Sequence, residues 1–241
     1  MGRGSQAKRR TKVPLPGEIE EAASSVPGFD CEAVLSAELA RQFFAQGYKF
    51  CLRYLPRAQA ALNLSAPEAT DILYSGVALM PVQHVRAPGW FPDQALGQQD
   101  GQEAAAMAKA IGFPAGVNVW CDVEEVNTAA QAQDVIVYCR AWHQAVRVGG
   151  YAPGLYVGAG ALLTGQQLFD LPFQHYWRSS SRVPDILNRG YQVVQFNPSI
   201  QMNGISVDLD ITLPDKQGGA ARWLRVSSVP PALEQQERRN G

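Results

Sequence analysis

The sequence predicts a single (β/α)8 barrel of the TIM type, and three observations carry this prediction. The length of 241 residues suits one α/β barrel. Hydrophobic residues make up 46% of the chain and charged residues 18%, which supplies enough apolar material for one large core. Strand-like and helix-like segments alternate along most of the chain, as they do around a parallel sheet. We therefore expect eight parallel strands with right-handed crossovers and some irregular structure in the later half.

The individual elements follow from local patterns. Short runs of apolar and β-branched residues predict strands at 26–30, 48–54, 77–83, 117–124, 154–157, 173–177, 192–196 and 205–211. Helical spacing predicts helices from about residue 33 to Gly47, from a capping box at Ser65 and Glu68 to Gly76, and over 101–111 and 128–148. The connection over 84–100 is long, and long barrel loops often carry function.

The two ends of the chain differ from its middle. Residues 1–12 hold five positive charges and no acidic residue, so the net charge of −1 leaves residues 13–241 at −6. We expect residues 1–25 to form a basic disordered leader, residues 26–225 the barrel domain, and residues 226–241 a frayed tail. The leader could instead attach to an anionic polymer such as cell wall or nucleic acid. No other feature of the chain favours nucleic acid.

The sequence also bears on location and on cofactors. Val-Pro-Leu-Pro-Gly follows the basic residues where a secretory signal would carry an apolar segment, so no cleaved signal is expected. No apolar run is long enough to predict a membrane span. We expect cytoplasmic synthesis, non-classical export or release by phage lysis, and a monomer. The four cysteines show no metal-ligand spacing with a histidine, so reduced thiols are expected, with no metal and no cofactor.

Acidic residues gather at the carboxyl ends of the predicted strands, where barrels carry their working residues. The first strand ends in Asp30, the fourth in Asp122 and Glu124, and the eighth in Asp208 and Asp210. Side chains two apart on a strand share a face, so Asp122 and Glu124 should both point toward the barrel axis. The first and eighth strands are neighbours in a closed barrel, which brings Asp30 and Asp208 together. The sequence therefore predicts carboxylates that converge.

Converging carboxylates suit the cleavage of a glycosidic bond. Several carboxylates in one low-dielectric mouth cannot all ionise freely, so the pKa of at least one rises. That one can protonate a glycosidic oxygen while an ionised neighbour supports positive charge on the sugar. Glu124 is the candidate acid because its side chain is longer, and Asp122 would stabilise charge or orient the substrate. Asp30 and Asp208 could tune both or hold an N-acetyl group.

Other interpretations of the acidic residues stay open. Asp30 could cap the following helix and do nothing else. The acidic cluster could hold Mg²⁺ or Ca²⁺, which take oxygen ligands. A pair of histidines at metal-ligand spacing or a phosphate-binding glycine loop would strengthen a metal interpretation, and the sequence has neither.

Further strand-end and loop residues are candidates for contact with a sugar. Trp90 in the long connection, Trp177 at the sixth strand and Tyr54 at the second could provide aromatic platforms, although strand-end aromatic residues are more often part of a core. The side chains of Gln83 and Gln195 could hydrogen-bond sugar hydroxyls. Asp210 is a further candidate for substrate binding.

The order and spacing of short motifs from Gly28 to Ile211 resemble the bacterial glycoside-hydrolase-like proteins formerly classed as a domain of unknown function. That family is similar to the family 25 lysozymes, which are β/α-barrel muramidases. The motifs are Gly28-Phe29-Asp30, Phe50-Cys51-Leu52-Arg53-Tyr54-Leu55, Leu64-Ser65 with Glu68, the helix from Gly101 to Gly112, Val119-Trp120-Cys121-Asp122-Val123-Glu124, Gly150-Tyr151-Ala152-Pro153-Gly154-Leu155-Tyr156, Tyr176-Trp177, Val194-Gln195-Phe196, and Val207-Asp208-Leu209-Asp210.

The resemblance implies a barrel that acts on the β-1,4 links of peptidoglycan, or descends from enzymes that do. It places the Asp-x-Glu of the lysozymes at Asp122 and Glu124, and their first-strand aspartate at Asp30. The aspartate of the lysozyme Val-Asp-Leu-Asn motif falls on Asp208, and its asparagine is replaced here by Asp210. A muramidase with Glu124 as the acid is the leading hypothesis. A catalytically silent glycan-binding protein and a hydrolase of another polysaccharide are the alternatives.

Overall fold

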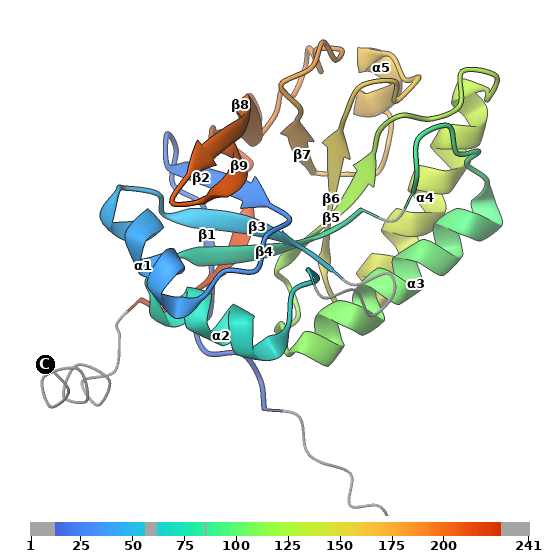
Figure 1. Ribbon diagram of the computed structural model, residues 1–241. Coiled ribbons are helices and arrows are strands. Elements are labelled where there is room, and N and C mark those ends of the chain that lie inside the picture. The colour runs from blue at the N-terminus through green and yellow to red at the C-terminus, as the bar shows by residue number, and fades with distance from the viewer. Residues whose placement is uncertain (1–12, 56–61, 85, 228–241) are drawn as a thin grey trace, which may run out of the picture.

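Eight strands close into a barrel in the computed structural model, which describes residues 13–55, 62–84 and 86–227 (Figure 1). In barrel order they are β2 (Pro27–Cys31), β3 (Phe50–Tyr54), β4 (Ala78–Gln83), β5 (Asn118–Val123), β6 (Ala152–Val157), β7 (His175–Arg178), β8 (Val193–Met202) and β9 (Ile205–Thr212). Each coincides with a predicted strand, apart from shifts at the ends. The predicted (β/α)8-type barrel is confirmed.

The last barrel strand runs against the predicted direction. Strands β2 to β8 pair in parallel, but β9 is antiparallel to both of its neighbours, β8 and β2. The expectation of eight parallel strands was therefore wrong for this one. The cause is a two-residue turn, Asn203-Gly204, whose backbone lies in the left-handed region with φ of 49° and 83°. Such a turn joins adjacent antiparallel strands and leaves no room for a crossover helix.

Helices cover the outside of the barrel, and capping residues fix where each begins. They are α1 (Ala37–Ala45), α2 (Ala66–Tyr74), α3 (Gln94–Ile111), α4 (Ala132–Val148) and the short α5 (Gly165–Phe169). The helix α3 begins earlier than predicted because the Asp93 side chain accepts the N–H of Leu96 and caps it there. Ser65 caps α2 as predicted, but the carboxylate of Glu68 turns away to other partners.

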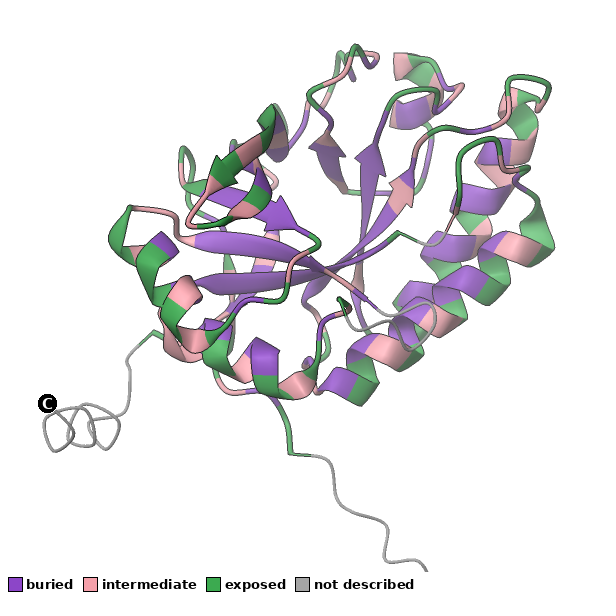
Figure 2. Ribbon diagram, in the orientation of Figure 1, coloured by how far each residue is buried: buried purple, intermediate pink, exposed green. Residues whose placement is uncertain are grey.

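The barrel strands are buried over most of their length (Figure 2), and two apolar layers lie on their opposite faces. Inside the barrel, Phe50, Leu52, Met80, Val82 and Trp120 form one buried cluster with their neighbours. The alternate residues of the same strands face outward and pack against the helices, among them Cys51, Leu79, Val119, Cys121 and Val123. The four cysteines are free and buried. This alternation decides which strand residues can reach the barrel axis.

Two short strands outside the barrel were not predicted. The strand β1 (Glu18–Glu21) pairs antiparallel with β10 (Arg222–Arg225), and β10 pairs with the start of β4 at Leu79. Trp223 stacks on Phe50 at 5.6 Å and joins the interior cluster, so this pair packs against the amino ends of the strands. The prediction of a disordered leader over 1–25 was wrong for residues 18–21, because β10 supplies their hydrogen bonds.

The outermost residues lie beyond the described chain. Residues 1–12, and with them the basic charges of the predicted leader, fall outside it, as do residues 228–241 of the predicted tail. Among the described helices, none combines the length and the apolar character that a membrane span needs.

Candidate active site

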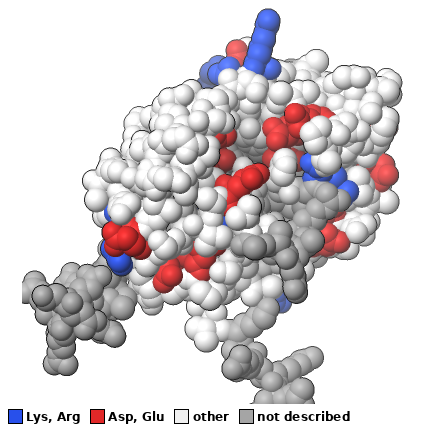
Figure 3. Space-filling model, viewed as in Figure 1, with Lys and Arg blue, Asp and Glu red and all other residues white. Residues whose placement is uncertain are grey.

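Polar side chains from neighbouring strands meet at the carboxyl-end mouth of the barrel. Asp30 lies in β2, Tyr54 ends β3, His84 follows β4, and Asp122 and Glu124 lie at the end of β5. On the face of the molecule shown in Figure 3, Asp and Glu side chains gather near the middle. The predicted convergence of carboxylates at this end of the barrel is therefore present in the structure.

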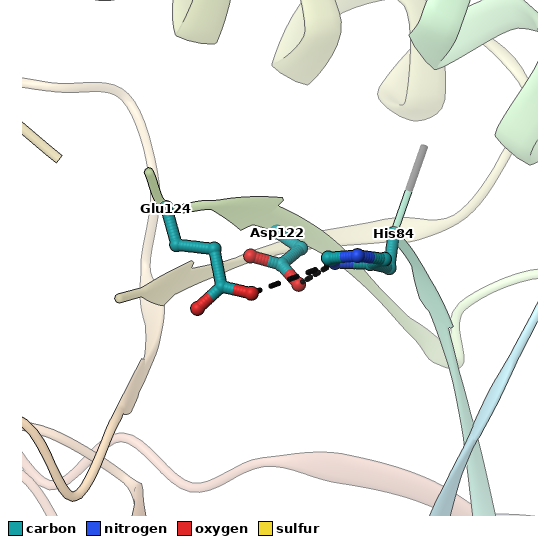
Figure 4. A group of neighbouring side chains, drawn as sticks. All are labelled: His84, Asp122 and Glu124. Atoms are coloured by element: carbon teal, nitrogen blue, oxygen red, sulfur yellow. Dashed lines mark hydrogen bonds and ion pairs between the residues drawn. The ribbon is translucent and has the colours of Figure 1, made fainter. Parts of the chain in front are cut away.

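Asp122, Glu124 and His84 form one contiguous group (Figure 4). The Nδ1 atom of His84 lies 2.6 Å from Oδ2 of Asp122 and 3.6 Å from Oε1 of Glu124. Only 5% of the Asp122 side chain is exposed, against 28% of Glu124 and 38% of His84. Asp122 is thus the buried member of the group, and Glu124 is the carboxyl that can reach a ligand.

Burial and mutual charge shift the pKa values of Asp122, Glu124 and His84. Burial raises the pKa of Asp122, and the hydrogen bond and charge of His84 oppose that rise. Burial, and then the charge of Asp122, raise the pKa of Glu124 to about 7. The hydrogen bond to Asp122 raises the pKa of His84 to about 9 against the effect of burial. Near neutral pH, Glu124 therefore lies close to its titration midpoint beside a protonated imidazole.

The same three side chains offer ligand atoms to a metal, all within 4.8 Å of one another. Their spacing favours a hydrogen bond over a shared ion. Two ligand atoms held at about 2.0–2.2 Å from one tetrahedral ion lie roughly 3.3 Å apart. The 2.6 Å between His84 Nδ1 and Asp122 Oδ2 is shorter than that and matches a charge-assisted hydrogen bond.

A second pair of carboxylates is held together by Gln195 of β8. The side-chain Nε2 of Gln195 donates to Oδ2 of Asp30 at 3.0 Å and to Oδ2 of Asp208 at 2.9 Å. The hydroxyl of Tyr54 donates to Asp30 at 3.0 Å, and the backbone N–H of Ser199 donates to Asp208 at 2.5 Å. Asp30 and Asp208 face each other in the register of β2 and β9, as predicted. Asp30 does not cap the next helix, because Ser36 does.

A cleft of about 440 Å³ opens beside this second pair. Its lining includes the carboxylates of Asp30, Glu32 and Asp208, the ring of Tyr54 and the apolar side chain of Leu62. The cleft offers hydrogen-bond acceptors on one side and a phenol ring on another, which is the mixture that a sugar ring requires.

Asp210 and Trp177 lie below the mouth, inside the barrel. The indole N–H of Trp177 donates to Oδ1 of Asp210 at 2.8 Å, and both side chains are buried. The ring of Trp177 packs against Tyr156 at 4.3 Å and Trp120 at 6.1 Å. The interpretation of Trp177 and Asp210 as substrate contacts is therefore corrected: the ring belongs to the core and the carboxyl to a buried network.

Asp30 and Asp210 are buried carboxyls that are placed to share one proton. Their carboxyls are within hydrogen-bonding reach, yet Oδ2 of Asp210 is buried and no other described group donates to it. Burial, and then the charge of Asp208, raise the pKa of Asp30 to about 7. Burial and the charge of Asp30 raise the pKa of Asp210 well above its usual range. We therefore expect the pair to hold one proton near neutral pH, which gives Oδ2 of Asp210 a hydrogen-bond donor.

This pair predicts that stability falls as pH rises from about 4 to about 7. The folded protein holds a proton that the unfolded chain has released in this range, so deprotonation opposes folding. Asp210→Asn keeps the shape, and its amide can donate to Asp30 without a shared proton. Chemical unfolding at several pH values should give a shallower decline for Asp210→Asn than for the wild type. Parallel declines would show that the pair does not hold a proton.

Two predicted contact residues point away from the mouth. Gln83 shares the outward face of β4 with Leu79: its Nε2 donates to the carbonyl of Asp100, and its Oε1 accepts the indole N–H of Trp142. It cannot bind a sugar in the barrel, so that prediction was wrong. Trp90 packs against Tyr138 at 4.9 Å, and its indole N–H donates to the backbone carbonyl of Glu124 at 2.9 Å. Its position is behind Glu124, where it supports the backbone.

His84 belongs to this candidate site, although the sequence patterns above do not single it out. It lies two residues after Val82, whose side chain points into the barrel, so the alternation of the strand carries His84 to the same side. Extending the strand pattern by one residue beyond Gln83 would have placed an imidazole beside Asp122. The metal-ligand spacing of the histidines gives no sign of this contact, because it joins residues far apart in the chain.

The barrel and its carboxylate mouth define a glycoside-hydrolase-like β/α barrel. The chain belongs to the family described as the Rv2525c-like, glycoside hydrolase-like domain, which matches residues 41–212. Among curated proteins, none matches it in sequence.

Solved structures share the fold at low sequence identity. The Tat-secreted protein Rv2525c of Mycobacterium tuberculosis is 15% identical with a TM-score of 0.62, over 82% of this chain and 99% of that one. The autolysin LytC of Streptococcus pneumoniae, solved with a synthetic peptidoglycan ligand, is 12% identical with a TM-score of 0.53, over 78% and 46%. A family 25 glycosyl hydrolase of Bacillus anthracis is 13% identical with a TM-score of 0.50, over 80% and 91%.

Proposed function

We propose that this protein is a glycoside hydrolase that cleaves β-1,4-linked glycan, with peptidoglycan as its substrate. Glu124 is the general acid and Asp122 is its ionised neighbour. Asp30 and Asp208, joined by Gln195, hold the sugar in the adjoining cleft together with Tyr54. The observation that carries the proposal is the position of Glu124, a part-exposed carboxyl whose pKa is raised to about 7 by burial and by Asp122.

In the proposed step, the O–H of Glu124 gives its proton to the glycosidic oxygen while the bond from that oxygen to the anomeric carbon breaks. The departing sugar leaves with a new hydroxyl group, and Glu124 is left as a carboxylate. Positive charge that develops on the sugar ring is stabilised by ionised Asp122. A water molecule supplies the hydroxyl that the anomeric carbon gains, and its remaining proton restores the acid.

The structural neighbours of this fold and the resemblance to lysozymes favour peptidoglycan as the substrate. A structural neighbour was solved with a synthetic peptidoglycan ligand. The sequence resemblance to the family 25 lysozymes implies that Asp122 and Glu124 correspond to their Asp-x-Glu pair. The cleft of about 440 Å³ beside Asp30 has room for a sugar unit and its substituent.

The test is release of reducing ends from purified peptidoglycan by the wild type and by Glu124→Gln. Release by the wild type that the substitution abolishes would support both the reaction and the acid. Release from a soluble β-1,4 glycan, with peptidoglycan left intact, would contradict peptidoglycan as the substrate but would still support glycoside hydrolysis. No release from any glycan by a folded wild type would contradict the proposal.

Binding without cleavage is a second candidate function, and one observation favours it. Four of the five predicted carboxylates already accept hydrogen bonds from side chains of the protein: Asp122 from His84, Asp30 and Asp208 from Gln195, and Asp210 from Trp177. A binding protein would co-sediment with insoluble peptidoglycan, and Glu124→Gln would co-sediment equally well. Neither protein would release reducing ends.

A further inference from the structure

We infer that His84 is a positioning residue that keeps the proton of the Asp122–Glu124 pair on Glu124. This inference deepens the proposed function and rests on it for its catalytic meaning. Two carboxyls in one buried site tend to share a proton, and shared protons are poorly placed to serve one particular oxygen. A fixed cation that stabilises the ionised form of one carboxyl leaves the proton on the other.

The geometry supplies this asymmetry. The His84 ring nitrogen is 2.6 Å from Asp122 but 3.6 Å from Glu124, so it makes a charge-assisted hydrogen bond to one carboxylate and only a longer-range contact with the other. Asp122 is also the more buried of the two and has less access to water. An ionised Asp122 therefore needs the imidazolium, whereas Glu124 can hold its proton toward the open mouth.

The surroundings of His84 keep its ring charged. At the end of β5, Asp122 and Glu124 face it, and the charge of Glu32, in the connection after β2, also acts on it. The ring of Tyr54 at the end of β3 meets it edge-on at 6.0 Å. These groups hold the pKa of His84 at about 9, led by the hydrogen bond to Asp122, so it remains an imidazolium while Glu124 titrates near 7.

Removing the charge should move both carboxyls in the same direction. His84→Gln can keep an N–H donor for Asp122 but carries no charge, so the pKa of Asp122 should rise by about 1–3 and that of Glu124 by less. The proposed reaction requires ionised Asp122 and protonated Glu124. Both the rising and the falling limb of the pH–rate profile should therefore move to higher pH. The KM should change little, because His84 acts on the carboxyls and not on the sugar.

Carbon-13 NMR of the side-chain carboxyls measures this directly, without turnover. We expect the Glu124 and Asp122 midpoints to rise in His84→Gln and to return toward wild-type values in His84→Lys, which restores a positive charge. His143→Gln is the matched control: burial lowers the pKa of His143 to about 4, so that ring is neutral and its loss removes no charge. Thermal unfolding identifies variants that fail to fold.

Each outcome has a distinct meaning. Unchanged carboxyl midpoints in folded His84→Gln would overturn the inference, and so would an equal change in His143→Gln. If His84→Gln does not fold, His84→Lys decides: midpoints near wild-type values support the charge requirement, and raised midpoints contradict it. Raised midpoints in His84→Gln, together with a wild type that cleaves no glycan, would leave the inference standing and refute the proposed hydrolase.

Discussion

Glu124→Gln is expected to lower the rate of reducing-end release from peptidoglycan by about 10²- to 10⁴-fold, the range that a general acid contributes. The amide has nearly the same shape and hydrogen-bonding reach but cannot give up a proton at neutral pH. The free energy of unfolding should not fall, because the substitution removes a carboxyl that burial and Asp122 disfavour when ionised. A catalytic loss with stability preserved separates chemistry from folding.

Glu125→Gln is the matched control for this result. Glu125 is the next residue along, its side chain is exposed, and its backbone φ of 49° turns the chain after β5. The same chemical change one position away should leave the rate within about 3-fold of the wild type, because an exposed charge is screened by solvent. Equal losses in both variants would indicate that the negative charge of the mouth, and not proton transfer from Glu124, limits the reaction.

The position of the acids could be predicted from the sequence because it depends on local periodicity. On β5, Val119 and Cys121 face the helices, which leaves Asp122 for the mouth. The pairing of Asp30 with Asp208 followed from barrel closure alone. Both conclusions needed only the alternation of side chains and the rule that the first and last strands of a barrel are neighbours.

The sequence predictions are wrong where a residue lies at a strand end but does not reach the mouth. Gln83 ends β4 but has the parity of the outward face, whereas the next residue, His84, has the inward parity. Trp177 points inward, yet Tyr156 and Trp120 close over it. The alternation of side chains along β4 is enough to distinguish Gln83 from His84 in the sequence. The burial of Trp177 depends on the packing of three strands, and no local sequence signal predicts it.

The antiparallel strand β9 and the pair β1–β10 differ in the same way: a local sequence signal predicts the first, and only tertiary contacts account for the second. Asn203-Gly204 between two apolar runs is a strong local signal for a hairpin, and it was available in the sequence. The pairing of Glu18–Glu21 with Arg222–Arg225 joins the two ends of the barrel domain, and the sequence Glu-Ile-Glu-Glu has little strand character of its own. Its stability comes from tertiary contacts such as Trp223 on Phe50.

Arg53→Met is expected to lower the free energy of unfolding by about 3–5 kcal/mol, because it leaves the buried Glu68 carboxylate without its cation. Arg53 is fully buried: its Nε donates to Glu68 at 2.8 Å, and its two terminal nitrogens donate to the carbonyls of Cys31 and Leu62. The same Glu68 oxygen accepts the N–H of Leu35. One guanidinium thus fastens α2 to the chain that follows Asp30.

The double variant Arg53→Met with Glu68→Leu tests whether the loss comes from the unpaired charge. Replacing both partners removes the buried carboxylate as well, so most of the stability should return. The exposed Arg41–Glu38 pair on α1 offers the control: Arg41→Met should change stability far less, because solvent already screens that pair. Denaturant unfolding of all four proteins measures these differences. A double variant as unstable as Arg53→Met would instead assign the loss to the Cys31 and Leu62 carbonyls, which accept hydrogen bonds from the guanidinium.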